Sequence, residues 1–193
     1  MTISHDEAIQ ILRKYNKEIF HLEHAITVGK VMKWMASDTG HKEKESYWEA
    51  VGILHDIDFE LYPNEHCKKC IDLLKENNID DETIHSICSH GYGICSDIEP
   101  KSEMEKILYA VDELTGIIFA SAKMRPSKSC EDMELSSLKK KFKDKKFAAG
   151  CSRDIINNGA KNLAWDIDVL LQKTLDAMKY YEKDIKNEVN SLL

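Results

Sequence analysis

Proline and glycine are scarce in this chain of 193 residues, which contains three prolines and eight glycines. Both residues interrupt regular structure. Their scarcity, together with apolar residues that recur every three or four positions, predicts helices joined by short loops. We find no convincing strand pattern, no internal repeat and no low-complexity linker. We therefore expect an all-α fold, a single compact helical bundle over residues 1–193.

Long apolar runs are also missing. No stretch approaches the 18 or more apolar residues that a membrane-spanning helix needs, and the first residues, MTISHDEAIQ, lack the basic and apolar regions of an export signal. The six cysteines could form disulfides, but a chain of this size does not need them, so we expect reduced thiols. These features predict a cytoplasmic protein with no membrane partner.

Basic residues are outnumbered by acidic ones, 27 to 34, and the net charge is −7. Nucleic-acid-binding surfaces are usually basic, so we expect no nucleic-acid partner. Residues 123–147 depart from this balance, because they carry nine basic and four acidic side chains. This stretch could meet an anionic ligand, or it could be a solvated basic loop.

The helix boundaries follow from capping residues and apolar spacing. Ser4 and Glu7 form a capping-box pattern that opens a helix reaching about Tyr15. Asn64, Asp80 or Asp81, and Ser152 are expected to cap later helices. The remaining helices are expected at about 20–36, 46–56, 64–76, 80–90, 102–122 and 164–189, with short basic helices before the last one.

One carboxylate lies inside the most apolar segment. Asp112 stands in the run ILYAVDELTGIIFASA, residues 107–122, which is apolar nearly all round the helix and should occupy the centre of the bundle. A buried carboxylate without a partner costs several kcal/mol or takes up a proton. We therefore expect a cation or strong hydrogen-bond donors beside Asp112.

Two other segments carry possible ligands among apolar residues. His24 interrupts the apolar stripe of the helix at 20–36, where a hydrogen-bonded core histidine is the alternative to a metal ligand. His55 and Asp56 end the apolar segment GILHDIDFE and diverge by about 100°, so they could share an ion only at the helix end or edge. Together with Asp112 they predict a mixed nitrogen and oxygen site that suits Mn, Fe, Ni, Co or Mg.

The order H…HD…D on an all-helical chain resembles the HD-domain metal-dependent phosphohydrolase superfamily, over about residues 20–116. The segments HAITVGKVM, ILHDIDFE, SHGYG, AVDELTG and RPSKS are similar to a bacterial subgroup of HD or HDIG-type hydrolases, although Asp58 replaces the glycine of HDIG. The resemblance implies an HD-type bundle. Its parts are a metal-site core at about 20–122, a basic loop and short helices at 123–160, and a C-terminal helix at 161–193.

The resemblance also implies a ligand set and a reaction. His24, His55, Asp56 and Asp112 would hold one divalent metal ion. Where a second ion is present, His66 and His90 would bind it and Asp56 would bridge the two. A bound dication activates water and polarises a phosphoryl group, so we expect hydrolysis of a phosphoester or phosphoanhydride bond.

Charged residues near these ligands are candidates for the remaining roles. Asp58 and Glu60 could orient water or protonate the leaving oxygen, or they could be loop carboxylates facing solvent. Lys123, Arg125 and Lys128 follow the core helix and could neutralise a substrate phosphate. A solvated loop explains these three side chains equally well.

The remaining histidines and cysteines are weaker candidates for metal ligands. His21 could replace His24 as a ligand or support it by a hydrogen bond. Cys67 and Cys70 lack a second CxxC pair, which favours small buried side chains over a zinc site. Three others are not expected to be ligands: His5, His41 and His85.

These observations favour a metal-dependent hydrolase that acts on a small phosphorylated metabolite, with nucleotides as the leading class. Two alternatives stay open: a di-iron oxygenase on the same ligands, and a non-catalytic sensor that binds a nucleotide or a partner helix. The last amphipathic helix could pack on the bundle or on a second copy, so either a monomer or a homodimer is expected.

Overall fold

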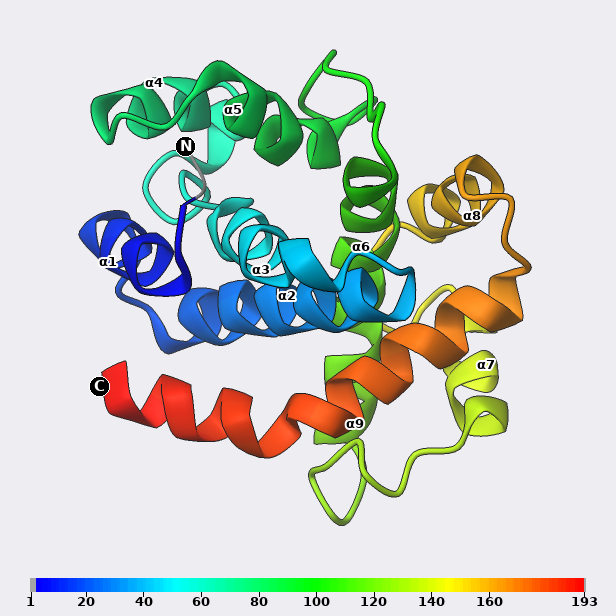
Figure 1. Ribbon diagram of the computed structural model, residues 1–193. Helices are drawn as coiled ribbons and strands as arrows, with labels where there is room; N and C mark the ends of the chain where they lie inside the picture. The colour runs from blue at the N-terminus through cyan, green and yellow to red at the C-terminus, as the bar shows by residue number, and fades with distance from the viewer. Residues whose placement is uncertain (1–2, 193) are drawn as a thin grey trace.

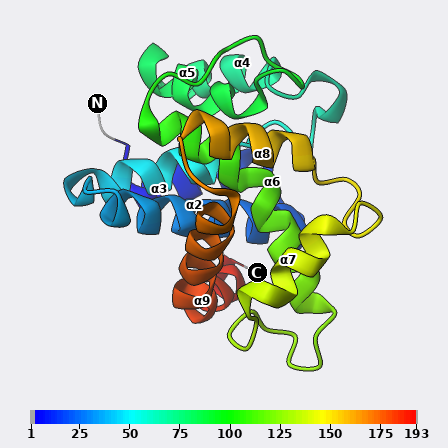
Figure 2. The same cartoon turned by 90° about the vertical axis from the view of Figure 1, so that its right-hand side faces the viewer.

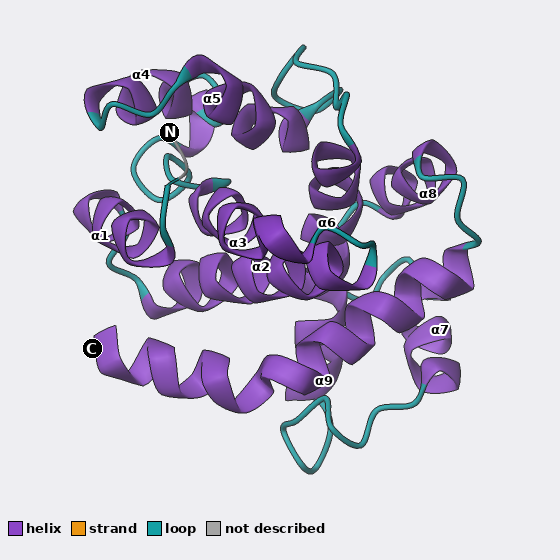
Figure 3. Ribbon diagram, viewed as in Figure 1, coloured by secondary structure: helices purple, strands orange, loops and turns teal. Residues whose placement is uncertain are grey.

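The computed structural model describes residues 3–192, and over this range the chain consists of helices and loops without a β-strand (Figures 1 and 3). The prediction of an all-α bundle is confirmed. None of the described helices is long and apolar enough to cross a membrane. The α-helices are α1 (His5–Tyr15), α2 (Ile19–Asp38), α3 (Glu45–Leu54), α4 (Lys69–Glu76), α5 (Asp81–Cys88), α6 (Glu103–Lys123), α7 (Leu135–Lys143), α8 (Arg153–Asn162) and α9 (Ile167–Leu192).

The helices α2, α3 and α6 form the centre of the molecule. Helix α2 packs against α3, α6 and α9, and α8 covers one side of α6. Figures 1 and 2 show α4 and α5 on one side of these central helices and α9 on the opposite side. The predicted central position of residues 107–122 is confirmed, because most apolar side chains of α6 are fully buried, including Ile107, Leu108, Val111, Leu114, Ile117 and Ile118.

Capping side chains begin several helices where the sequence predicts them. At the start of α1, Ser4 Oγ accepts a hydrogen bond from the Glu7 N–H, and the Glu7 carboxylate accepts one from the Ser4 N–H. Ser102 and Glu105 form the same capping box at α6. Asp80 caps α5 and Ser152 caps α8. These local signals fix helix starts because each satisfies a backbone N–H that the helix itself leaves free.

The prediction that Asn64 caps a helix reaching Glu76 is wrong. Residues Pro63–Glu65 form a short 3-10 turn, η2, and α4 begins only at Lys69. The interruption lies at Cys67, whose φ of 63° is left-handed and cannot continue a helix. This break leaves His66 and Cys67 outside α4, in the segment that precedes it.

Two glycines bring α2 and α3 into close contact. A Cβ placed on Gly52 would lie 2.9 Å from the Cα of Gly29, and one placed on Gly29 would lie 2.6 Å from Cγ1 of Ile53. Larger residues at these two positions would hold the helices apart. The glycines therefore set the spacing between the two helices that carry His24 and lead to His55.

Candidate metal centre

Three of the four expected core ligands meet at one point. His24 projects from α2, His55 stands at the end of α3, and Asp112 lies in the middle of α6. The Nε2 atoms of His24 and His55 are 3.1 Å apart, and Asp112 Oδ1 lies 3.1 Å from the first and 3.2 Å from the second. Side chains far apart in the sequence thus form a compact triangle of nitrogen and oxygen atoms.

Asp56 joins this triangle to a second group of side chains. Its Oδ2 lies 3.6 Å from His24 Nε2 and 3.4 Å from His55 Nε2. Its Oδ1 lies 3.4 Å from the Nε2 atoms of both His66 and His90. The carboxylate therefore spans two neighbouring groups of ligand atoms, one on each oxygen.

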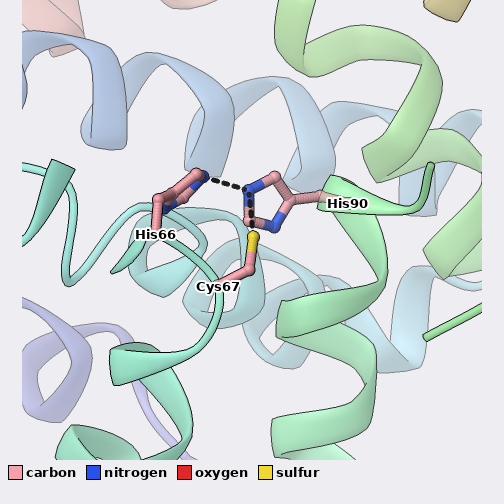
Figure 4. A group of neighbouring side chains, drawn as sticks. All are labelled: His66, Cys67 and His90. Carbon is pink, nitrogen blue, oxygen red and sulfur yellow. Dashed lines mark hydrogen bonds between the residues drawn. The ribbon is translucent and has the colours of Figure 1, made fainter. Parts of the chain in front are cut away.

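The second group contains a thiol as well as two imidazoles. His66 and His90 approach each other to 3.3 Å between Nε2 atoms, and Cys67 Sγ is 3.8 Å from His90 Nε2. Figure 4 shows the three side chains pointing toward one another. Their ligand atoms lie within 4.8 Å of each other, as do those of His24, His55 and Asp112. Each group could hold a metal ion.

The spacing of these atoms fits metal coordination. With bonds of about 2.0–2.2 Å, adjacent nitrogen or oxygen ligands lie about 2.8 Å apart in an octahedron and up to about 3.6 Å apart in a tetrahedron. The distances among the ligand atoms of His24, His55, Asp56 and Asp112, from 3.1 to 3.6 Å, fall in this range. A dication placed among these atoms would need little rearrangement of the side chains.

The tautomers of three histidines follow from their hydrogen bonds. His55 Nδ1 donates to the Gly52 carbonyl at 2.7 Å, and His90 Nδ1 donates to the Ile87 carbonyl at 2.6 Å. A carbonyl can only accept, so each Nδ1 carries a proton, and in the neutral ring each Nε2 presents a lone pair. His66 Nδ1 is 2.8 Å from an oxygen of Asp58, which has the same effect. A hydrogen bond of this kind on the other ring nitrogen is typical of metal-binding histidines.

The electrostatics of the cluster also favour a cation. Burial would lower the pKa of His55, but the charges of Asp56 and Asp112 raise it well above its usual value. Burial would raise the pKa of Asp112, yet the facing histidines His55 and His24 lower it far below the usual range. Lone pairs and carboxylate oxygens that face one another at these distances repel unless positive charge lies among them.

The carboxylate of Asp58 supports the cluster from behind. Asp58 is fully buried, and its two oxygens accept hydrogen bonds from His66 Nδ1 and from the backbone N–H of Cys70, each at 2.8 Å. The first bond, together with the neighbouring charge of Asp56, raises the pKa of His66 to about 10 in spite of its burial. The expected role in orienting water or protonating a leaving group is not supported, because both oxygens are engaged. The solvent-facing alternative is also wrong.

Glu60 does not reach the cluster either. Its carboxylate accepts hydrogen bonds from the backbone N–H groups of Lys17 and Glu18, at 2.9 and 3.1 Å, just before α2. This carboxylate satisfies free N–H groups at a helix start, which gives it a structural role, and its catalytic role stays a prediction.

The three basic residues at the end of α6 and just beyond it do not line the cleft at the metal cluster. Arg125 is paired with Asp132 at 2.8 Å, and Lys128 Nζ donates to the Lys123 carbonyl. Neither lines the cleft at the metal cluster, so the structure does not support a phosphate-binding role for them. Lys123 lines a separate cavity that reaches His24, with its Nζ 3.9 Å from the Glu23 carboxylate.

The cluster opens into a cleft of about 320 Å³. His24, Asp56, His66, His90 and Asp112 line its floor, and apolar side chains form part of its wall. Three of these are exposed: Phe20 at 61%, Ile94 at 60% and Phe59 at 39%. Phe20 thus lines the cleft while most of its side chain remains exposed.

Sequence reasoning missed two kinds of residue in this cleft. Glu113 lines it, and burial beside Asp112 raises the pKa of Glu113 to about 6. The signal was present, because Glu113 is a second carboxylate in the same apolar run. Cys67 was treated as a small buried side chain; it is buried, but it also faces His90, and its Sγ is 2.8 Å from Cys95 Sγ.

The other histidines lie outside the cluster. His21 lines the cleft and lies 3.5 Å from Glu18, so it is not one of the converging ligands. His5 lies between Glu49 and Glu188, at 3.0 and 2.8 Å. The remaining two pair with carboxylates: His41 with Glu103 and His85 with Glu105.

Comparison of this chain with protein-family models, with curated proteins and with solved structures gave no match.

Proposed function

We propose that this protein is a metal-dependent phosphohydrolase that cleaves a small phosphorylated metabolite. The observation that carries the proposal is the Asp56 carboxylate, which has imidazole nitrogens at 3.4–3.6 Å from each of its oxygens. Such an arrangement suits one ion on His24, His55, Asp56 and Asp112, with room for a second on His66 and His90. Membership of the HD-domain superfamily, which the sequence resembles through these residues, is part of the proposal.

The ligand chemistry narrows the choice of metal. Four imidazoles and two carboxylates favour Mn, Fe, Co or Ni over Mg, which prefers oxygen ligands and keeps several waters. The thiol of Cys67 beside His66 and His90 shifts the second group further toward softer ions.

The bound dication would supply Lewis acidity, which makes water a nucleophile at neutral pH and polarises the phosphoryl group. The chain's own residues set the geometry. Gly52, Ile87 and Asp58 fix the ring orientations of His55, His90 and His66. Glu113 faces the cleft and accepts a hydrogen bond from the Ser152 N–H through one oxygen, which leaves the other to orient water. We place this activity in the cytoplasm on a small anionic substrate, without a nucleic-acid or membrane partner, in a monomer or a homodimer.

Metal analysis of protein purified without chelator, followed by a substrate panel with each candidate metal, tests the proposal. Asp56→Ala should lose bound metal and phosphate release while keeping its helical circular dichroism. Asp72→Ala is the matched control, because Asp72 is an exposed aspartate on α4. Phosphate release by metal-free Asp56→Ala at the rate of the unchanged protein would refute the proposal.

The shared carboxylate also suits two iron ions, so a di-iron oxygenase is the second candidate. Oxygen uptake by the iron-loaded protein without phosphate release from any substrate would favour it. A non-catalytic sensor predicts tight ligand binding with neither oxygen uptake nor phosphate release under any metal.

A further inference from the structure

A second cavity adjoins the metal cluster through His24. It has a volume of about 330 Å³ and lies between α2 and α6, where the loop between α7 and α8 also contributes to its wall. His24, Phe20, Gly116 and Cys151 line both this cavity and the metal cleft, so the two spaces are neighbours. The other lining residues are Thr27, Thr115, Phe119, Ala120, Lys123 and Ala148.

The polar groups in this wall are already satisfied. Thr27 Oγ1 donates to the Glu23 carbonyl at 2.7 Å, and Thr115 Oγ1 donates to the Asp112 carbonyl at 2.7 Å. Each hydroxyl is held against its own helix. Burial raises the pKa of the Cys151 thiol to about 11, so this side chain stays neutral. These residues present carbon and a neutral thiol to the cavity.

The charged member of the wall is also engaged. Lys123 Nζ lies 4.6 Å from the centroid of the Phe119 ring and 3.9 Å from the Glu23 carboxylate. A nucleobase and a ribose would lose hydrogen bonds to water here and find few partners in return, which is costly. An apolar group would lose nothing comparable and would gain from leaving water.

We propose that the substrate is a phosphoester whose alcohol part is a compact alkyl or aryl group, held in this cavity while the phosphate lies at the metal cluster. The proposal rests on the proposed phosphohydrolase function. A cavity of about 150 Å³ can hold benzene, so 330 Å³ has room for roughly two rings or a chain of similar bulk. Hydrolysis breaks the bond between phosphorus and the ester oxygen. The water oxygen joins phosphorus, and a water proton goes to the departing alcohol.

The exposed apolar side chains at the mouth of the cleft agree with this substrate class. Phe20 lines both spaces, and its ring centroid is 6.5 Å from that of Phe119 inside the cavity. Phe59 and Ile94 extend the apolar surface along the cleft. An apolar substrate would cover these side chains as it enters.

A series of ethyl, butyl and hexyl phosphates, with phenyl phosphate and a nucleoside 5′-monophosphate for comparison, tests the inference. If each added methylene is buried, kcat/KM should rise by about fourfold per methylene until the cavity is full. Ala120→Phe fills the cavity and should remove this dependence on chain length, so that kcat/KM for hexyl phosphate falls to that for ethyl phosphate. Ala149→Phe is the control, because Ala149 is exposed and does not line the cavity. Ala120→Leu serves in its place if the larger side chain prevents folding.

Binding of ethyl, butyl and hexyl phosphonates, measured by calorimetry, gives a readout that needs no turnover. Affinity that rises with chain length in the unchanged protein and in Ala149→Phe, but not in Ala120→Phe, supports the inference even without catalysis. In that case the hydrolase proposal alone would fail. The inference would be overturned by equal kcat/KM and equal affinity for the ethyl and hexyl compounds, or by a preference for the nucleotide. Phosphate release in that case would still support the hydrolase proposal.

Discussion

Replacing Gly52 by alanine should separate α2 from α3 and weaken the metal centre. The new Cβ would lie 2.9 Å from Gly29 Cα and 3.0 Å from Gly29 N, whereas ordinary contacts begin at 3.4 Å. These neighbours are backbone atoms, so they cannot rotate away. The helices must part by at least about 0.5 Å at this point, the difference between 3.4 and 2.9 Å.

The expected losses of folding stability and of metal affinity can each be estimated. Overpacking costs about 1–3 kcal/mol, and the better helix propensity of alanine offsets about 0.5–1 kcal/mol of this. The net loss, about 1 kcal/mol at the middle of these ranges, corresponds to a melting temperature lower by about 2–4 °C in a chain of this size. Metal-ligand distances tolerate only about 0.2 Å, and the Gly52 carbonyl also orients His55. We therefore expect metal affinity to fall by about 10- to 100-fold.

Thermal unfolding by circular dichroism and titration with Mn²⁺ or Co²⁺ measure both effects. Gly150→Ala is the matched control, because a Cβ at Gly150 meets nothing within 4 Å, and its stability should change by less than about 0.5 kcal/mol. If Gly52→Ala bound metal as tightly as Gly150→Ala, the argument that the glycine contact sets the His24 to His55 spacing would be wrong.

Three further predictions concern pH, capping and metal. The ring N–H groups of His5 face the carboxylates of Glu188 and Glu49, which accept hydrogen bonds from the ring and raise its pKa from 6.5 to about 9. Because the folded state binds this proton more tightly, His5→Gln should cost about 2 kcal/mol in urea unfolding below pH 6.5, and the difference should disappear as pH rises through 9. A constant difference up to pH 10 would contradict this. Glu60→Gln should lower the free energy of unfolding by about 1 kcal/mol. Its metal content, measured by mass spectrometry, should not change. Loss of bound metal in this variant would show that Glu60 contributes to the metal centre. Metal at about 1,000 times its dissociation constant should stabilise the protein by about 4 kcal/mol. The effect should appear as a rise in melting temperature that EDTA reverses. A similar rise in Asp56→Ala would argue against the proposed ligands.

The residues that could be predicted from sequence are those whose chemistry conflicts with their surroundings. Asp112 in the apolar run of α6 and His24 in the apolar stripe of α2 both meet at the cluster. Helix starts at Ser4 and Ser102 were predictable for a different reason, since a capping box is complete within four residues. In each case the signal is local.

The residues that were assigned wrongly depend on partners that the sequence does not place. Glu60 accepts hydrogen bonds from Lys17 and Glu18, which lie more than 40 positions earlier, so its role depends on how α1 and α2 are joined. Asp58 is engaged by His66 and by the Cys70 N–H, which lie on either side of the left-handed residue Cys67. No pattern of spacing predicts such a break.

The metal cluster and the apolar cavity are connected by helical geometry. Thr27 follows His24 by three positions in α2, and Thr115 follows Asp112 by three positions in α6. Side chains three residues apart share a helix face and are separated by about 4.5 Å along the axis. Both helices therefore place the cavity wall roughly one turn from the metal ligands. A phosphoester whose apolar group begins one or two atoms beyond phosphorus matches this offset, whereas a nucleotide would place its polar ribose there.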